Sequence, residues 1–246
     1  MKTPHFYAVI IGSEILNGRR IDKHFDFVRD ALLHRGHVLF STFIIKDDRE
    51  LIHSIYTLIK KDPNGVMFSF GGIGSTPDDL TRQIASDVFS DGILVSHPSF
   101  YSDILERFGD QAFPHRITMA MLPKKSELLH NVINNMSGFY LDNRYFFMPG
   151  FPEMSHPMVE EALERFYPLA EKMYRKTLIA QTSENTLIEV MENLNPSVDF
   201  SSLPMITNGI PTVEISIASP DKTLCDDNFN LFIHDLTNKS ILFKVL

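Results

Sequence analysis

The chain has 246 residues, of which 43% are hydrophobic and 22% charged, and this length suits one large domain or two modest ones. Its formal net charge of −8 at pH 7 argues against broad binding to nucleic acid or to an anionic membrane, because neither surface attracts an acidic protein. The single cysteine, Cys225, provides neither a disulfide framework nor a zinc site. The apolar run near the N-terminus is too short for a signal peptide or a membrane span, so we expect a cytoplasmic protein.

Three apolar segments in the first 70 residues predict buried strands. They span residues 6–11, 38–45 and 65–70, and each ends at a glycine or at charged residues. After each strand, apolar residues recur at helical spacing, over 25–32, 51–59 and 80–88. This alternation predicts an α/β fold with a parallel sheet and helices on both faces, in which ligands bind beyond the carboxyl ends of the strands.

The stretch "SGFYLDNRYFFMPGFPEM" predicts a β-hairpin followed by a proline-rich loop. Asp142 and Asn143 lie at its centre, and both residue types tolerate the left-handed backbone of a tight turn. Apolar residues over 159–166 then predict a helix.

The hydrophobic periodicity resets near residues 168–175, where we place a domain boundary. The remainder predicts a small α+β module, with a strand at 177–181, a helix at 187–194, a strand at 212–219, a helix at 229–236 and a short strand at 241–245. This module has no glycine-rich loop and no carboxylate cluster typical of a site. The expected domains are residues 1–170 and 171–246.

The sequence "GGIGSTPDDLT", residues 71–81, has the composition of a phosphate-binding loop. Gly71, Gly72 and Gly74 permit left-handed backbone conformations and a close approach to a ligand that a Cβ atom would prevent. Their N–H groups, with the first unpaired N–H groups of the following helix, would form a concave anion-binding site.

Two adjacent aspartates at this loop need an explanation, because phosphate is an anion. Thr76 is a candidate N-cap with Pro77 at the first helical position, and Asp79 would complete a capping box, gaining ~0.3–1 kcal/mol from the helix dipole. Asp78 and Asp79 cannot both serve this cap. An uncompensated carboxylate ~4 Å from a phosphate costs about 4 kcal/mol at an effective dielectric of ~20. The loop therefore favours either a divalent cation that bridges carboxylate and phosphate, or a carboxylate that binds a hydroxyl or amino group.

Polar residues follow the other two strands as well. Glu14 follows the first strand, and Asp47 and Asp48 follow the second. Taken singly, each residue is explained equally well as a solvated loop charge or as a helix-entry residue. The carboxyl ends of neighbouring parallel strands lie at the same end of a sheet, however, so we expect these side chains to converge there. Ser13 and Ser75 are able to donate to phosphate oxygens or to cap helices. The ten histidines are scattered without metal-ligand spacing, and we interpret most of them as surface or core residues.

Taken in order, "GSEILNGRRID", "KDD", "GGIGSTPDDLT", "ITMAMLP", "SGF" and "MPGFPEM" resemble the MoaB/Mog-type molybdopterin-binding superfamily. The likeness covers residues 6–168 and is closest to the amino-terminal domain of the competence/damage-inducible protein CinA; the pyrophosphatase-like domain of eukaryotic FAD synthase is similar too. The resemblance implies a three-layer α/β/α sandwich that binds a phosphorylated pterin or nucleotide at the strand ends. The tail after residue 176 resembles the small KH-like domain of CinA, whereas the carboxy-terminal amidase domain of CinA has no counterpart in these residues, so deamidase activity is not expected.

The resemblance also implies roles for individual residues. Asp47 and Asp79 match the two essential aspartates of the adenylating enzymes, and Asp78 would join them in holding or orienting a metal. The residues expected to bind the ligand come from three loops, and they are Ser13, Glu14, Gly71, Gly72, Gly74, Ser75, Thr76, Thr81, Pro149, Gly150 and Pro152. CinA-type domains hydrolyse ADP-ribose, and the FAD synthase domain hydrolyses FAD. The implied activity is therefore a nucleotide pyrophosphatase that depends on a divalent metal (cobalt, magnesium or manganese), with potassium as a further cofactor.

Three positions depart from the family pattern and keep alternatives open. Ser75 stands where the family usually has proline, Ser13 where it often has Asp or Asn, and His24 where Asn is common. These departures favour a second hypothesis, a non-catalytic binder of molybdopterin or a nucleotide; molybdopterin adenylylation is a third. Nucleic-acid binding by the tail fits poorly with the acidic charge and the lack of a GxxG loop. Related domains assemble as dimers or trimers, so a homo-oligomer is expected, with a phosphorylated small molecule as ligand and no membrane partner.

Overall fold

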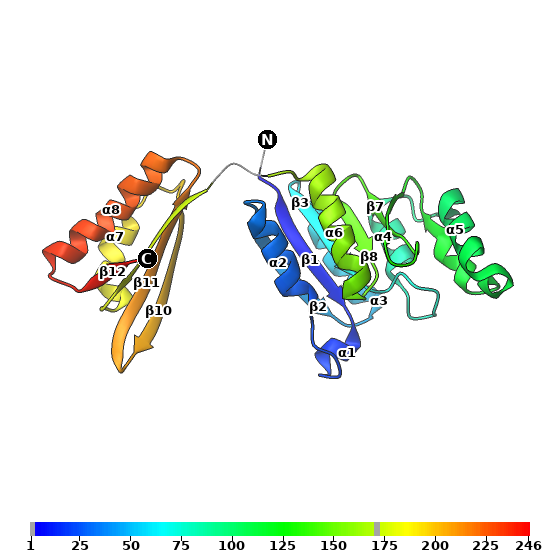
Figure 1. Ribbon diagram of the computed structural model, residues 1–246, viewed down its shortest axis with the longest axis horizontal. Helices are drawn as coiled ribbons and strands as arrows, with labels where there is room; N and C mark the ends of the chain where they lie inside the picture. Colours follow the sequence, from blue (N-terminus) through cyan, green and yellow to red (C-terminus); the bar gives the residue numbers. More distant parts are fainter. Residues whose placement is uncertain (1–2, 170–172) are drawn as a thin grey trace. The chain divides into compact units, whose positions relative to one another are not determined.

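The computed structural model describes residues 3–169 and 173–246, and these two stretches form two compact units (Figure 1). The boundary expected between residues 170 and 171 lies outside the described residues. The first unit is α/β and the second is a smaller α+β unit.

The first unit is built on a six-stranded mixed sheet with the strand order β2-β1-β3-β8-β7-β6. Its parallel strands are β2 (Leu39–Ile45), β1 (His5–Ile11), β3 (Gly65–Phe70) and β8 (Tyr145–Met148). The strands β7 (Gly138–Leu141) and β6 (Glu127–Leu129) are antiparallel. The first three strands predict a parallel sheet, but the sheet is mixed. The tight turn at Asp142 and Asn143, both with positive φ, reverses the chain between β7 and β8.

Helices cover both faces of this sheet, as predicted (Figure 1). The helices are α2 (His24–His34) and α6 (Pro152–Phe166) on one face, and α3 (Arg49–Lys61) and α4 (Thr81–Phe89) on the other. Because successive strand residues point to opposite faces, Phe6 and Ile10 of β1 pack beneath α2 and α6, while Val9 packs beneath α3 and α4. This is the three-layer α/β/α sandwich.

The chain between α4 and β6 forms an arm of short elements that the sequence pattern does not predict. They are β4 (Leu94–Ser96), α5 (Pro98–Phe108), two 3-10 turns at Gly109–Ala112 and Arg116–Ala120, and β5 (Met121–Pro123). Pro98 stands at the start of α5, and the His97 side chain caps the helix by accepting from the N–H of Phe100. The buried side chains of Phe100 and Ile104 attach α5 to the core beneath α3 and α4.

The second unit is a four-stranded antiparallel sheet with the order β10-β11-β9-β12, packed against helices. Its elements are β9 (Tyr174–Ala180), a 3-10 turn (Glu184–Leu187), α7 (Ile188–Glu192), β10 (Asp199–Thr207), β11 (Ile210–Ser219), α8 (Lys222–Asn238) and β12 (Phe243–Val245). Val213, Ile215 and Ile217 of β11 point inward against α8, as their alternation predicts. The edge strand β10 is not among the predicted elements.

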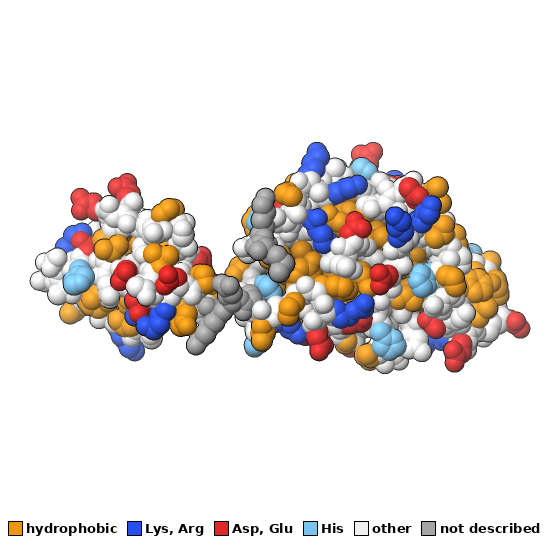
Figure 2. Space-filling view, turned by 90° about the horizontal axis from the view of Figure 1, so that it is seen from above, with side chains coloured by type: hydrophobic (Ala, Val, Ile, Leu, Met, Phe, Trp, Pro, Cys, Tyr) orange, Lys and Arg blue, Asp and Glu red, His pale blue; other side chains and the backbone are white. Residues whose placement is uncertain are grey.

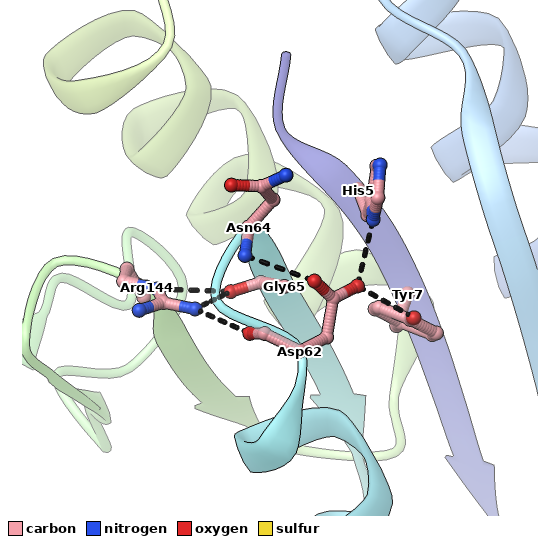
Figure 3. A network of polar contacts seen from close by, with 6 residues as sticks. All are labelled: His5, Tyr7, Asp62, Asn64, Gly65 and Arg144. Carbon is pink, nitrogen blue, oxygen red and sulfur yellow. Dashed lines mark hydrogen bonds and ion pairs between the residues drawn. The ribbon is translucent and has the colours of Figure 1, made fainter. Parts of the chain in front are cut away.

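A polar network ties the amino-terminal ends of β1 and β3 together, at the sheet edge opposite the strands' carboxyl ends (Figure 3). The Asp62 carboxylate contacts Nδ1 of His5 at 2.7 Å and accepts from the hydroxyl of Tyr7 at 2.9 Å and from the N–H of Asn64 at 2.9 Å. Arg144 donates to the backbone carbonyl of Asp62 at 3.0 Å. Burial alone would raise the pKa of Asp62, but the bonds from Asn64, His5 and Tyr7 lower it below its ordinary value. The network fastens the turn before β3.

Charges of both signs are interspersed on the molecular face shown in Figure 2, so this face offers no broad area of positive charge. Within residues 3–169 and 173–246, no helix combines the length and the apolar character needed to cross a membrane.

Candidate ligand-binding site

The carboxyl ends of the parallel strands open onto one cavity of about 610 Å³, a size typical of small-molecule sites. Ile11 at the end of β1, Asp47 after β2 and Gly71 after β3 all line it. The sequence-predicted residues that line the cavity are Glu14, Asp47, Gly71, Gly72, Gly74, Ser75, Thr76, Asp78, Asp79, Pro149 and Gly150. The convergence expected from the strand ends is therefore present in the structure.

The carbonyl groups of the glycine loop are all held from the side of α4. The hydroxyl of Thr81 donates to the carbonyl of Gly71 at 2.9 Å, and the N–H of Thr81 donates to the carbonyl of Gly72 at 3.0 Å. The buried guanidinium of Arg82 donates to the next two carbonyls, those of Ile73 and Gly74. A trans peptide places its C=O and N–H on opposite sides, so the N–H groups of residues 72–75 point away from α4.

Three of these N–H groups are free to bind a ligand. In the described part of the chain, no hydrogen-bond partner is found for the N–H of Gly72, Ile73 or Ser75, and all three residues line the cavity. The N–H of Gly71 is already bonded to the carbonyl of Met148, at 2.9 Å. The loop thus presents a row of donors, the arrangement that binds anions in backbone nests, although the donors differ in part from those expected.

The loop geometry requires glycine at its first two positions. Gly71 and Gly72 have φ values of 101° and 69°, in the region that other residues rarely adopt. A Cβ on Gly71 would lie 2.5 Å from the carbonyl oxygen of Ile11, and one on Gly72 would lie 2.5 Å from the hydroxyl oxygen of Thr81. Neither position has room for another side chain.

The carboxylate of Asp79 is bonded to its own loop. It accepts from the N–H of Gly74 at 2.8 Å and from the N–H and the hydroxyl of Thr76 at 2.7 Å each. The predicted bond from Asp79 to Thr76 is present, but the prediction that a helix starts at Pro77 is wrong, because α4 begins at Thr81 and residues 76–79 form a turn closed by the N–H of Asp79 and the carbonyl of Thr76. Asp79 therefore shapes the phosphate loop instead of capping α4.

Asp47 is oriented by Ser13. One carboxylate oxygen of Asp47 accepts from both the N–H and the hydroxyl of Ser13, at 2.9 Å each. The other oxygen has no hydrogen-bond partner among the described residues. Ser13 itself does not line the cavity, so its role here is to hold Asp47 at the cavity wall.

Two more carboxylates and one guanidinium complete the polar wall. Glu14 lies 3.9 Å from Arg20, and the Arg20 guanidinium lies 5.7 Å from the centroid of the Phe151 ring. Asp78 is exposed, and hydrogen bonds from Thr76 and from its own backbone lower its pKa below the ordinary value. Asp78 is therefore charged at neutral pH.

The predicted metal set of Asp47, Asp78 and Asp79 is not assembled as a metal site. Within residues 3–169 and 173–246, no three His, Cys, Asp or Glu side chains are grouped so that they could hold a metal ion. The three carboxylates line one cavity, yet Asp79 already accepts three hydrogen bonds from its own loop. The side chains alone therefore do not fit a resident metal.

Thr81 and Pro152, two further predicted ligand contacts, lie behind the cavity wall instead of on it. Thr81 is buried and positions the glycine loop, as described above. Pro152 begins α6 and faces a second cavity of about 30 Å³, which His24 also lines.

His24 is buried beneath two of the loops. Its ring stacks on Phe70, the residue before the glycine loop, with 4.2 Å between centroids, and it hydrogen-bonds the backbone of Gly150. Only 3% of His24 is exposed, and its Nδ1 has no partner in the described chain. Burial lowers its pKa below the ordinary value, so His24 is neutral at physiological pH. It supports the loops and does not contact the ligand cavity.

With the fold and the cavity established, comparison with known proteins identifies the family. Residues 7–169 match the family described as "Probable molybdopterin binding domain". The chain belongs to this family. A CinA-like protein of Citrifermentans bemidjiense is 31% identical over 160 residues, which cover 62% of this chain and 38% of that protein. A CinA-like protein of Flavobacterium psychrophilum is 25% identical, and the match covers 93% of this chain and 57% of that protein. The chain thus spans between 38% and 57% of the length of these two relatives.

The family fold is also seen in a solved structure. The crystal structure of CinA from Thermoplasma acidophilum matches with a TM-score of 0.58 and 22% identity, covering 65% of this chain and 97% of that one. This likeness shows the fold of the α/β/α unit.

Sequence reasoning missed further residues that line the cavity. They are Ile73, Phe100, Phe108, Arg116, Met119, Asn134, Met136, Ser137, Phe151 and Met154, and Arg20 was missed on the polar wall. Arg20, Phe151 and Met154 stand within or beside stretches that carried the family resemblance, so their position was a usable signal. Ile73, Met119 and Ser137 also stand within such stretches, namely "GGIGSTPDDLT", "ITMAMLP" and "SGF". The others come from the arm around α5 and from the loop before β7, where no motif marks them; they are Phe100, Phe108, Arg116, Asn134 and Met136.

Proposed function

We propose that this cavity binds a phosphorylated small molecule, a nucleotide or a pterin, through the N–H groups of the glycine loop. The observation that carries the proposal is that Thr81 and Arg82 bind the carbonyl groups of residues 71–74. Because of these bonds, the N–H groups of the same peptides point away from α4. Free N–H groups of three cavity-lining residues then supply donors for phosphate oxygens.

The acidic residues of the cavity do not prevent phosphate binding. The Asp79 charge is compensated by three donors from Gly74 and Thr76, and the Asp47 charge by two donors from Ser13. Arg20 and Arg116 add two positive charges to the lining. The oxygen of Asp47 that Ser13 leaves free would accept from a hydroxyl or amino group of the ligand, which ribose and pterin both carry.

Hydrolysis of a pyrophosphate bond in that ligand is the second candidate function. The observation that favours it is the position of Asp47. Its carboxylate has one oxygen without a hydrogen-bond partner among the described residues and lines the same cavity as the glycine loop. Asp47 would orient a water molecule that attacks phosphorus, with the phosphate of the leaving nucleotide as the departing group. Because the side chains do not form a metal site by themselves, metal dependence is a question for the assay.

The test is a paired binding and turnover screen. Melting temperature and product formation are measured with ADP-ribose, FAD, NAD and ATP, with EDTA and then with magnesium, manganese or cobalt. Wild type is compared with Asp47→Asn and with Asp227→Asn, a control that changes an exposed aspartate of α8.

Binding without turnover by wild type establishes a binding protein. Cleavage that Asp47→Asn abolishes and Asp227→Asn leaves intact establishes the pyrophosphatase. If no compound raises the melting temperature and none is cleaved under any metal condition, the proposal is wrong.

A further inference from the structure

We propose that Arg116 and Phe108 form a subsite that stacks on a flat heteroaromatic ring of the ligand, so that the cavity takes a phosphorylated compound carrying such a ring. This inference rests on the proposed function and adds to it the residues that recognise the part of the ligand remote from the phosphate.

The two residues contact each other at the cavity wall. The Arg116 guanidinium lies over the Phe108 ring, with 4.6 Å between its Cζ atom and the ring centroid. Its Nη1 atom also donates to the carbonyl of Gln111 at 2.9 Å. These two contacts orient the guanidinium, and its other face is available to a planar ring.

Among the described residues, no carboxylate pairs with the Arg116 guanidinium. In the described part of the chain, Arg116 forms no ion pair with Asp or Glu, whereas Arg20, the other guanidinium of the lining, lies 3.9 Å from Glu14. Arg116 is exposed to the cavity and to solvent, so its stacking face stays accessible. The Arg116 guanidinium is therefore available to a ligand in the cavity.

The surroundings of the pair suit a ring with polar edges. Phe100, Met119 and Met136 supply apolar surface to the same cavity. Asn134 and Ser137, which also line it, supply side chains that donate and accept hydrogen bonds. Adenine, flavin and pterin rings all have this character, an apolar face with donors and acceptors around the edge.

The loop that carries Asn134 is tied to the same helix. Arg107 also lies over the Phe108 ring, 5.3 Å from its centroid, and donates to the carbonyl of Asn134 at 3.0 Å. The α5 arm and the loop before β7 therefore hold the ring subsite as one piece.

The experiment compares AMP with ribose 5-phosphate, which lacks only the base, by calorimetric titration. The variants are Arg116→Ala and Arg116→Lys, where lysine keeps the charge but loses the planar face. Arg29→Ala is the matched control, because Arg29 lies 5.5 Å from the centroid of the Phe25 ring on α2, outside the cavity.

We expect wild type to bind AMP about 10-fold more tightly than ribose 5-phosphate, since only AMP has a base that stacks on the guanidinium. Both Arg116 variants should lose most of this preference and keep their affinity for ribose 5-phosphate within about 2-fold. Equal loss of both ligands, or full rescue by Arg116→Lys, would show that Arg116 is an anion contact and would overturn the subsite. A preference that Arg116→Ala leaves unchanged would overturn it as well, while the proposed function would stand. Failure of wild type to bind either compound overturns the inference together with the proposed function for nucleotides.

Discussion

One carboxylate oxygen of Asp79 accepts both the N–H and the hydroxyl of Thr76, at 2.7 Å each. With the bond from Gly74 to its other oxygen, Asp79 closes the phosphate loop on itself. The aspartate at the edge of the phosphate site is therefore part of the loop structure, and any contact it makes with a ligand would compete with these bonds.

Substituting Asp79 with asparagine should destabilise the protein even without ligand. The amide has only one accepting oxygen, so at least one donor of Gly74 or Thr76 loses its partner. We expect a loss of about 1–3 kcal/mol, and thus a melting temperature lower by roughly 5 °C. Differential scanning calorimetry beside Asp227→Asn measures it. An unchanged melting temperature together with lost turnover would instead make Asp79 a catalytic residue.

Arg82 should control ligand affinity although it does not line the cavity. Replacing it with leucine removes the donors to the carbonyls of Ile73 and Gly74, so these peptides are free to rotate and the N–H groups lose their common direction. We expect the affinity for ADP-ribose to fall by about 10-fold or more, and the fold to lose about 2 kcal/mol. Arg82→Lys should recover part of the affinity. Unaltered binding by Arg82→Leu would contradict the proposed loop mechanism.

Glycine 71 should tolerate no side chain, and Gly18 provides the comparison. Both have positive φ, but a Cβ at Gly71 would lie 2.5 Å from the Ile11 carbonyl oxygen, whereas a Cβ at Gly18 would meet nothing within 4 Å. Gly18→Ala should lower the free energy of unfolding by about 1 kcal/mol from backbone strain alone. Gly71→Ala should lower it by at least about 3 kcal/mol and should also abolish ligand binding. Urea unfolding of both variants measures the difference, and equal losses would refute the steric account.

Stability should fall as pH decreases from 7 to 5. His156 stacks on Phe27 with 3.7 Å between centroids, and burial is the main cause that lowers its pKa to about 4; burial also lowers the pKa of His24. The unfolded chain binds protons below pH ~6.5, the folded chain only at lower pH, so protonation favours unfolding in this window. We expect the free energy of unfolding to drop by about 1 kcal/mol.

The His156→Phe variant should reduce this pH dependence, because phenylalanine preserves the ring and does not titrate. Ser54→Ala, which changes an exposed residue of α3 that does not titrate, should leave the dependence as in wild type. Unfolding curves in urea at pH 7 and pH 5 provide the comparison. The same slope in His156→Phe as in wild type would assign the effect to other groups.

Local pattern predicted the parts of this structure that local chemistry determines. The strands β1 and β3 are continuous apolar runs, and the turn at Asp142 and Asn143 depends on two residue types that tolerate positive φ. The glycine loop could be located because three glycines directly follow the apolar run of β3, a local pattern typical of phosphate-binding loops.

Contacts between distant residues could not be predicted in this way. Thr76, Pro77 and Asp79 look like a helix start, yet the carboxylate also reaches back to Gly74, and this longer bond keeps the segment a turn. Arg82 follows the loop as an ordinary helical residue, and only the fold shows that its guanidinium turns back onto two carbonyls.

The ring-binding wall was missed for a related reason. Arg116 begins a 3-10 turn, which no period of 2 or 3.6 residues marks, and Phe108 ends α5, a helix that the sequence analysis did not identify. The edge strand β10 escaped prediction because it includes Pro204 and alternates weakly between polar and apolar residues.

The account depends most on the N–H groups of Gly72, Ile73 and Ser75 as the phosphate donors. Amide nitrogen–proton NMR spectra of the labelled protein, titrated with ADP-ribose, test this directly. We predict saturable shifts of these three amides at one common dissociation constant, with the amide of Gly209 in the second unit unchanged. The account is contradicted if ADP-ribose binds but the signals of these three amides do not shift, or if only signals of residues outside the cavity shift. The glycine loop would then not be the phosphate site.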